Sequence, residues 1–250
     1  MIWVSPTDVR NFTICPWLVY YQKVLKKPYR LTSSQLARGS FEHDYRKRMN
    51  SQLIKDDSDI VKTSEIAARE AYDFSLRNQG AQYSDSITEH YETIKATERI
   101  RSNVDDHRSH PVIESEKYLK CTFELESCQF GLRGYVDAIV KDQNQHHIPL
   151  DYKTGSSVNV EADVNQVISY ALLMQENGYG PVPSILIHYV RENQKISVMA
   201  TEERKEGVLE ILRSVHNLIE SRNEPDIRPL GIEHCNRCHY RQSCEERVLV

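Results

Sequence analysis

The stretch HIPLDYKTG, residues 147–155, closes an apolar run with an acid, an aromatic residue, a base and a glycine. Successive side chains of a strand alternate between its two faces, so we expect Asp151 and Lys153 on one face and Tyr152 on the other. On an exposed strand such a pair would be an ordinary ion pair that contributes little to stability. At the end of a buried strand, the same two side chains are able to carry chemistry.

A further acid lies upstream, in the strand candidate GYVDAIV at 134–140. Asp137 interrupts an apolar run, where an unpaired charge would be costly. If the two strands are neighbours, Asp137 and Asp151 converge on one point, and their carboxylates repel each other unless a cation lies between them. Hard oxygen ligands favour Mg²⁺ or Mn²⁺, so the pattern predicts a divalent-metal site.

The order of the expected elements predicts the fold class. Strands are predicted at 111–127, 130–142, 146–154, 183–190 and 195–201, and helices at 5–27 with a break at Pro16, 33–54, 159–180 and 202–223. The polar stretch 60–108 is predicted to form surface helices. We therefore expect an α/β fold of the mixed α+β type, in which helices flank a central mixed sheet.

We expect the 250 residues to form a single domain with four parts. These are N-terminal basic helices at 1–50, an acidic helical insertion at 51–110, the core at 111–230 and a cysteine-rich tail at 231–250. Residues 1–50 carry nine Lys or Arg against three acidic residues, although the whole chain has a net charge of −4. Phosphate contacts depend on local charge, so a nucleic-acid footprint is expected in this part; solvated helix faces are the alternative.

The composition, 39% hydrophobic and 27% charged, is typical of a soluble globular protein. No apolar run approaches the roughly 20 residues of a membrane span. The start, MIWVSPTDVRNF, lacks the features of a secretory signal. We therefore expect a cytoplasmic protein without a membrane partner, a setting in which clustered cysteines favour metal over disulfides.

Three cysteines lie close together in HCNRCHYRQSC, residues 234–244. Cys235, Cys238 and Cys244 are one thiolate short of a four-cysteine cluster site, and Cys15 is able to supply the fourth if the chain ends meet. Alternatively, His234 or His239 completes a zinc site. The spacing alone leaves zinc and iron–sulfur open. Two other cysteines, Cys121 and Cys128, are interpreted as ordinary small residues.

Four motifs occur together in a recognisable order. RGSFEH supplies a G-x-x-x-H step with Gly39 and His43, GYVD and LDYKTG follow, and NQVISY supplies a Q-x-x-x-Y step with Gln166 and Tyr170. Together they resemble the RecB-like branch of the PD-(D/E)XK nuclease superfamily. With one cysteine before a proline and three near the C-terminus, the chain is similar to the CRISPR-associated Cas-four family. It also resembles, more distantly, the iron–sulfur nuclease domain of the eukaryotic replication nuclease–helicase.

The resemblance implies a restriction-endonuclease-like core and a role for each motif residue. His43, Asp137 and Asp151 would ligate Mg²⁺ or Mn²⁺ with the carbonyl of Tyr152, and Lys153 would orient the attacking water. Two further residues, Gln166 and Tyr170, would contact substrate phosphate or brace Lys153. The resemblance also implies that a [4Fe–4S] cluster is held by four cysteines: Cys15, Cys235, Cys238 and Cys244.

The function implied is a metal-dependent deoxyribonuclease that acts as an exonuclease on single-stranded DNA or overhangs. Its role would be to trim prespacers for the Cas-one–Cas-two integration complex in CRISPR adaptation. Two alternatives stay open: a RecB-like nuclease of viral or repair role outside CRISPR, and a catalytically silent cluster-bearing subunit that binds DNA or a partner. In the basic N-terminal segment, Trp17, Tyr20 and Tyr21 either stack on unpaired bases or belong to the core.

Overall fold

The computed structural model describes most of the chain. The described ranges are 1–27, 33–55, 59–79, 83–95, 107–125, 128–154, 159–226, 235–236 and 238–248. Within them, no helix combines the length and apolarity that a membrane crossing requires.

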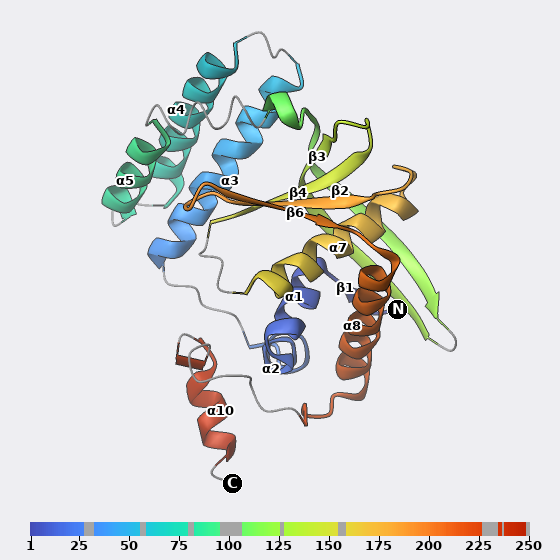
Figure 1. The fold of residues 1–250 in the computed structure, drawn as a ribbon. Coiled ribbons are helices and arrows are strands. Elements are labelled where there is room, and N and C mark those ends of the chain that lie inside the picture. The colour runs from blue at the N-terminus through green and yellow to red at the C-terminus, as the bar shows by residue number, and fades with distance from the viewer. Residues whose placement is uncertain are drawn as a thin grey trace.

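A mixed six-stranded sheet forms the centre of the molecule (Figure 1). Its strands are β1 (Trp3–Val4), β2 (Val112–Leu125), β3 (Cys128–Lys141), β4 (His147–Lys153), β5 (Ser184–Tyr189) and β6 (Gln194–Met199). The hairpin β2–β3, the pair β3–β4 and the pair β5–β6 are antiparallel, whereas β4 and β5 run parallel. The crossover between β4 and β5 is made by a helix, as parallel neighbours require. The predicted mixed α/β architecture is confirmed.

The helices lie on both sides of this sheet. Figure 1 shows α1 (Pro6–Ile14), α7 (Val160–Glu176) and α8 (Glu202–Ser221) on one side, and α3 (Ser33–Leu53) with α4 (Ile60–Gln79) and α5 (Ser84–Lys95) on the other. Further helical elements are α2 (Pro16–Val19), the π-helix η1 (Tyr20–Val24) and α10 (Arg241–Val248). Helices α4 and α5 fall within the predicted insertion.

The first helix begins and ends where local chemistry dictates. Ser5 caps α1 in a capping box with Asp8, which satisfies amide groups that a helix start leaves unpaired. The helix ends at Cys15, whose backbone is extended, and Pro16 opens α2. Because proline cannot donate a helical hydrogen bond, the chain restarts rather than continues here. The predicted break at Pro16 is confirmed, and it places Cys15 at a corner between two helices.

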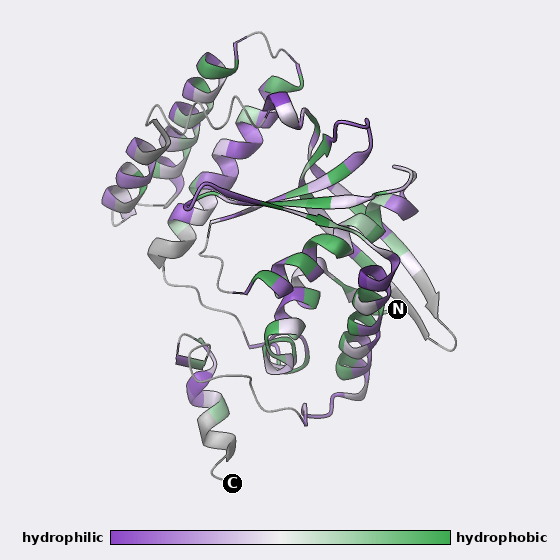
Figure 2. Ribbon diagram, viewed as in Figure 1, coloured by the Kyte–Doolittle hydropathy of each residue, from purple (hydrophilic) through white to green (hydrophobic). Residues whose placement is uncertain are grey.

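Three apolar clusters hold the elements together. The largest fills the space between the sheet and helices α1, α7 and α8, and α7 is buried along most of its length. Figure 2 shows more hydrophobic residues along α7 than along α4 and α5. A second cluster joins α3, α4 and α5 around Phe41, Tyr45 and Ile87. The third joins residues near both chain ends and includes Cys15 and Tyr240.

Candidate active site

The two acids of the strand motifs meet where β3 and β4 part. These strands pair in register as far as Ala138 and Leu150, so Asp137 and Asp151 occupy the next positions of the two strands. The amide of Tyr152 donates to Asp137 Oδ2 at 2.9 Å, which fixes the Asp137 side chain across the gap. Asp151 is only 4% exposed. Burial raises the pKa of Asp151, Lys153 opposes the shift, and the Asp137 carboxylate adds to it.

Lys153 contacts two residues, one on the strand and one on a helix. Its ammonium lies 2.7 Å from Asp151 Oδ2 and donates to Gln166 Oε1 at 2.5 Å. The strand therefore places Asp151 and Lys153 on one face, as its alternation predicts, and α7 brings Gln166 to the same point. This confirms the prediction that one face carries the pair.

Tyr170 lies one turn beyond Gln166 on α7 and is buried. Its pKa is raised, first by burial and then by the charges of Asp151 and Asp137. The backbone of β3 approaches it closely at Gly134: a Cβ there would lie 3.3 Å from Tyr170 Cε1 and 2.9 Å from Pro6 Cδ. A side chain at position 134 would thus push α7 and α1 away from the acids.

Helix α3 delivers His43 from the other side of the sheet. His43 Nε2 lies 3.3 Å from Asp137 Oδ1, and the imidazole is half exposed. The hydrogen bond to Asp137 raises the pKa of His43 against the opposing effect of burial. The other ring nitrogen, Nδ1, lies 3.1 Å from Glu116 Oε1 on β2. Sequence reasoning left Glu116 unassigned, because an exposed strand face explained it equally well.

Asp163 is a second residue that sequence reasoning missed. It is buried on α7 and contacts Arg10 Nε and the Tyr189 hydroxyl, the latter at 2.9 Å. Its Oδ1 also lies 3.6 Å from Lys153 Nζ. A signal was available: Asp163 stands three residues before Gln166, so both share one face of the helix.

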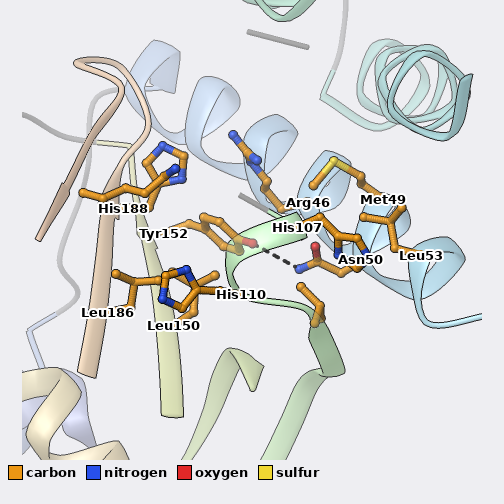
Figure 3. A pocket seen from close by; sticks show the side chains of 12 residues that line it. Arg46, Met49, Asn50, Leu53, His107, His110, Leu150, Tyr152, Leu186 and His188 are labelled. Atoms are coloured by element: carbon orange, nitrogen blue, oxygen red, sulfur yellow. Dashed lines mark hydrogen bonds between the residues drawn. The ribbon is translucent and has the colours of Figure 1, made fainter. Parts of the chain in front are cut away.

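The far face of β4 carries a small pocket beneath α3 (Figure 3). Tyr152 points into it, and its hydroxyl accepts a hydrogen bond from Asn50 Nδ2 at 3.4 Å. The guanidinium of Arg46 lies 5.0 Å from the Tyr152 ring centroid and is paired with the buried Glu42. Because Tyr152 is held from this side, the side chains of Asp151 and Lys153 are directed to the opposite face.

These donors match the preferences of a hard divalent ion. His43 Nε2 and Asp137 Oδ1 are 3.3 Å apart, near the separation of about 3 Å that neighbouring ligands of an octahedral Mg²⁺ have. Asp151 is engaged by Lys153 instead. In the described part of the chain, no three His, Cys, Asp or Glu side chains form a ready-made metal-binding group. The chemistry of the donors fits such an ion, and Asp151 is the one whose contacts must rearrange.

The cysteines at the two chain ends come together. Cys15, Cys238 and Cys244 share one apolar cluster, and Cys235 interacts electrostatically with Cys238. Burial raises the pKa of the Cys15 thiol to about 11, and the neighbouring Cys244 and Cys238 add to this. Tyr240 stacks on Tyr21 at 4.8 Å and donates to the Lys27 carbonyl at 2.8 Å, which fastens the tail to the N-terminal segment.

Two further expectations concern the aromatic residues and the histidines near these cysteines. Tyr20 and Tyr21 are buried, so of the two alternatives for these rings the core interpretation holds. One histidine offered as a zinc ligand, His234, lies outside the described residues, whereas His239 packs edge-on against Tyr240. Cys15, Cys238 and Cys244 thus share one apolar cluster and Cys235 lies near Cys238, but among the described residues no three of these side chains form a ready-made metal-binding group.

Comparison with known proteins gives the family. A profile of the PD-(D/E)XK nuclease superfamily matches residues 3–245. The chain belongs to this superfamily, and it is a nuclease by that membership.

Two characterised proteins show similarity to parts of the chain. It is 24% identical over 123 residues to the CRISPR-associated exonuclease Cas4 of Francisella tularensis subsp. novicida, a match covering 49% of this chain and 61% of that protein. It is 25% identical over 171 residues to the DNA replication ATP-dependent helicase/nuclease DNA2 of Saccharomyces cerevisiae, covering 62% of this chain and 10% of that protein. The first match thus spans under two thirds of the relative's length and the second a tenth.

Two solved structures resemble the fold at low identity. The first, a crystal structure of SSO0001, has TM-score 0.48 and 11% identity over 98% of this chain and 86% of the other. A putative exonuclease from Eubacterium rectale has TM-score 0.47 and 10% identity over 94% of this chain and 88% of the other.

Proposed function

We propose that the protein is a Mg²⁺- or Mn²⁺-dependent deoxyribonuclease whose active site lies where β3 and β4 part. The observation that carries the proposal is the grouping of Asp137, Asp151 and Lys153 at this point, with Gln166 fixing the lysine. A silent DNA-binding subunit would have no chemical need for a buried, pKa-raised acid beside a positioned ammonium.

In this proposal, each residue has a distinct task. His43, Asp137 and Asp151 hold the ion together with the carbonyl of Tyr152. A bound divalent ion supplies a hydroxide nucleophile at neutral pH and offsets charge on the phosphoryl oxygens. Lys153 orients the attacking water and stabilises the charge that grows on the phosphate in the transition state.

The bracing residues keep Lys153 in place. Gln166 accepts a hydrogen bond from its ammonium, and the carboxylate of Asp163 lies 3.6 Å away. Tyr170, buried on the same helix face as Gln166, completes the packing behind the acids. Restricting the lysine in advance lowers the entropy that must be lost when the phosphate is engaged.

We propose single-stranded DNA or DNA overhangs as the substrate, cut as an exonuclease would. The similarity to a CRISPR-associated exonuclease supports a role in trimming prespacers for a Cas-one–Cas-two integration complex. The test is cleavage of end-labelled single strands, overhang duplexes and blunt duplexes in Mn²⁺ and in EDTA. Metal-dependent shortening of the single strand and the overhang, with the blunt duplex left intact, is expected. Equal cutting of all three would contradict the substrate assignment.

We further propose that Cys15, Cys235, Cys238 and Cys244 hold a [4Fe–4S] cluster. Three of these cysteines belong to an apolar cluster of residues from near the two ends of the chain, and an iron–sulfur cluster suits such a weakly polar, four-thiolate setting. The cluster would act as a structural staple there. Iron and acid-labile sulfide analysis of anaerobically purified protein tests this, and stoichiometric zinc without sulfide would contradict it.

A nuclease role in DNA repair or replication, outside CRISPR, is the second candidate. The match to the helicase/nuclease DNA2 over 62% of this chain favours it. A pull-down with Cas-one and Cas-two proteins from the same genome separates the two roles. Co-purification would support prespacer processing, and its absence under conditions that preserve the Cas-one–Cas-two complex would favour repair.

A further inference from the structure

Glu116 occupies an irregular position in strand β2. The strand pairs with β3 at Ser115↔Ala138 and at Lys117↔Val136, and Glu116 falls between these pairs, level with Asp137. Its φ is +49°, a left-handed conformation that residues with a side chain rarely adopt within a strand. Such backbone strain persists only where the surrounding structure enforces it, and it is concentrated at functional sites.

Both oxygens of Glu116 contact α3. Oε1 lies 3.1 Å from His43 Nδ1, and Oε2 lies 2.5 Å from Lys47 Nζ. His43 and Lys47 are one helical turn apart and present the same face to the strand. The Glu116 side chain is 22% exposed, so the contact with the imidazole is partly shielded from water.

Both ring nitrogens of His43 face carboxylates, Nδ1 toward Glu116 Oε1 at 3.1 Å and Nε2 toward Asp137 Oδ1 at 3.3 Å. A carboxylate only accepts hydrogen bonds, so a ring that serves both contacts carries a proton on each nitrogen. A divalent ion bound at Nε2 would displace the proton from that nitrogen, and the proton that remains on Nδ1 would then face Glu116 Oε1. A histidine whose second nitrogen donates to a carboxylate is oriented, and made more basic, for binding a metal through the first.

We propose that Glu116 is a positioning residue that fixes the ring orientation and the Nδ1–H tautomer of His43, with Lys47 holding the Glu116 carboxylate. The inference rests on the proposed function, because it takes His43 Nε2 as a ligand of the divalent ion. It adds a residue outside the four sequence motifs, and one that acts through His43 rather than on the substrate.

The decisive variant is Glu116→Gly. Glycine adopts φ +49° without steric cost, so this change removes the carboxylate while relieving the backbone. The matched control is Glu114→Gln on the same strand, since Glu114 contacts Lys117 and the Tyr179 hydroxyl, each at 2.7 Å, rather than His43. The full-length chain is used throughout, and thermal melting of each variant checks that it is folded.

The first readout is Mn²⁺ affinity, measured by calorimetry without DNA. Loss of an outer carboxylate partner weakens metal binding by about 10–100-fold. We expect that loss in Glu116→Gly and wild-type affinity in Glu114→Gln. If Glu116→Gly binds Mn²⁺ with wild-type affinity and His43→Ala binds it more weakly, the role of Glu116 is overturned and that of His43 stands. Wild-type affinity in both overturns the metal role of His43 and this inference with it.

The second readout is the protonation of the His43 ring itself. Nitrogen-15 NMR of the histidine rings in the Mg²⁺-loaded wild type distinguishes the two tautomers, with His43→Ala used to assign the signals. We expect the Nδ1–H form of His43 in the wild type and the Nε2–H form to gain population in Glu116→Gly. A wild-type ring protonated at Nε2 and free at Nδ1 would overturn the proposal.

Discussion

Lys153 Nζ donates to Gln166 Oε1 at 2.5 Å, which joins the end of strand β4 to the middle of helix α7. The lysine also lies 2.7 Å from Asp151 Oδ2, so it is held from the strand and from the helix at once. Position 153 is the last residue of β4, where a long side chain would otherwise move freely.

Gln166→Leu tests the value of that restraint. It keeps the volume but removes the acceptor, so Lys153 loses a charge-assisted hydrogen bond, which is worth about 1.5–3 kcal/mol. We expect kcat to fall about tenfold to a hundredfold while Mn²⁺ affinity stays unchanged. Single-turnover cleavage of a labelled single strand measures the first, and calorimetry the second. A matching loss of metal affinity would place Gln166 at the metal rather than at the lysine.

Asp151→Asn should separate activity from stability. The folded-state pKa of Asp151 is raised, mainly by burial, so the ionised side chain destabilises the fold. A raised carboxyl pKa gives stability that is present at low pH and is lost as the pH rises above the unfolded value. In EDTA, we expect the variant to melt a few degrees higher than the wild type at pH 7.5, a difference of about 1 kcal/mol, and the difference to shrink toward pH 4.

Nuclease activity of Asp151→Asn should be lost at every pH. Melting curves from differential scanning calorimetry are compared with cleavage rates for the same samples. A variant that is less stable than the wild type at pH 7.5 would mean that the contact with Lys153 outweighs the cost of burial.

Cys15→Ser should loosen the junction between the chain ends. Cys15 is buried at the corner between α1 and α2, in contact with the cluster that contains Cys238 and Cys244. We expect loss of the brown colour that a [4Fe–4S] cluster would give the protein. We also expect a melting temperature lower by roughly 4–8 °C, equivalent to about 2 kcal/mol. Cys121→Ala is the control, because Cys121 lies on β2 outside this cluster and should leave the absorbance near 400 nm intact. Equal bleaching in both variants would contradict the ligand assignment.

Gly134→Val should damage the site without touching a reactive group. The added side chain would meet Pro6 and Tyr170, which are held on α1 and α7. Overpacking of this kind costs about 1–3 kcal/mol, and it should displace Gln166 together with α7. We expect lower thermal stability and reduced kcat. Gly207→Ala on α8 is a control of similar chemistry, since a Cβ at that position meets no atom within 4 Å.

Local patterns were sufficient to predict the residues that act through short-range geometry. Strand alternation predicted that Asp151 and Lys153 share a face, and one helical turn related Gln166 to Tyr170. The break at Pro16 followed from proline's missing amide hydrogen. Each of these relationships is set within a few residues of the chain.

Contacts across long separations were not predictable in the same way. Glu116 reaches His43 because the backbone turns to a positive φ at that residue, and no local pattern in VIESEKYL indicates this. Tyr21 is covered by Tyr240, more than two hundred residues away, which stacks on its ring. A basic, aromatic segment therefore looked like a DNA-binding surface although its aromatic rings belong to the core.

Cleavage of end-labelled single-stranded DNA by Lys153→Met, with Mn²⁺ present, tests the central claim most directly. Methionine keeps the length of the side chain but removes the ammonium that lies between Asp151 and Gln166. Our account predicts a loss of about 10²–10³-fold in single-turnover rate, with unchanged DNA binding and a cooperative melting transition that shows the variant to be folded. A Lys153→Met protein that is folded and cuts at the wild-type rate would contradict the account.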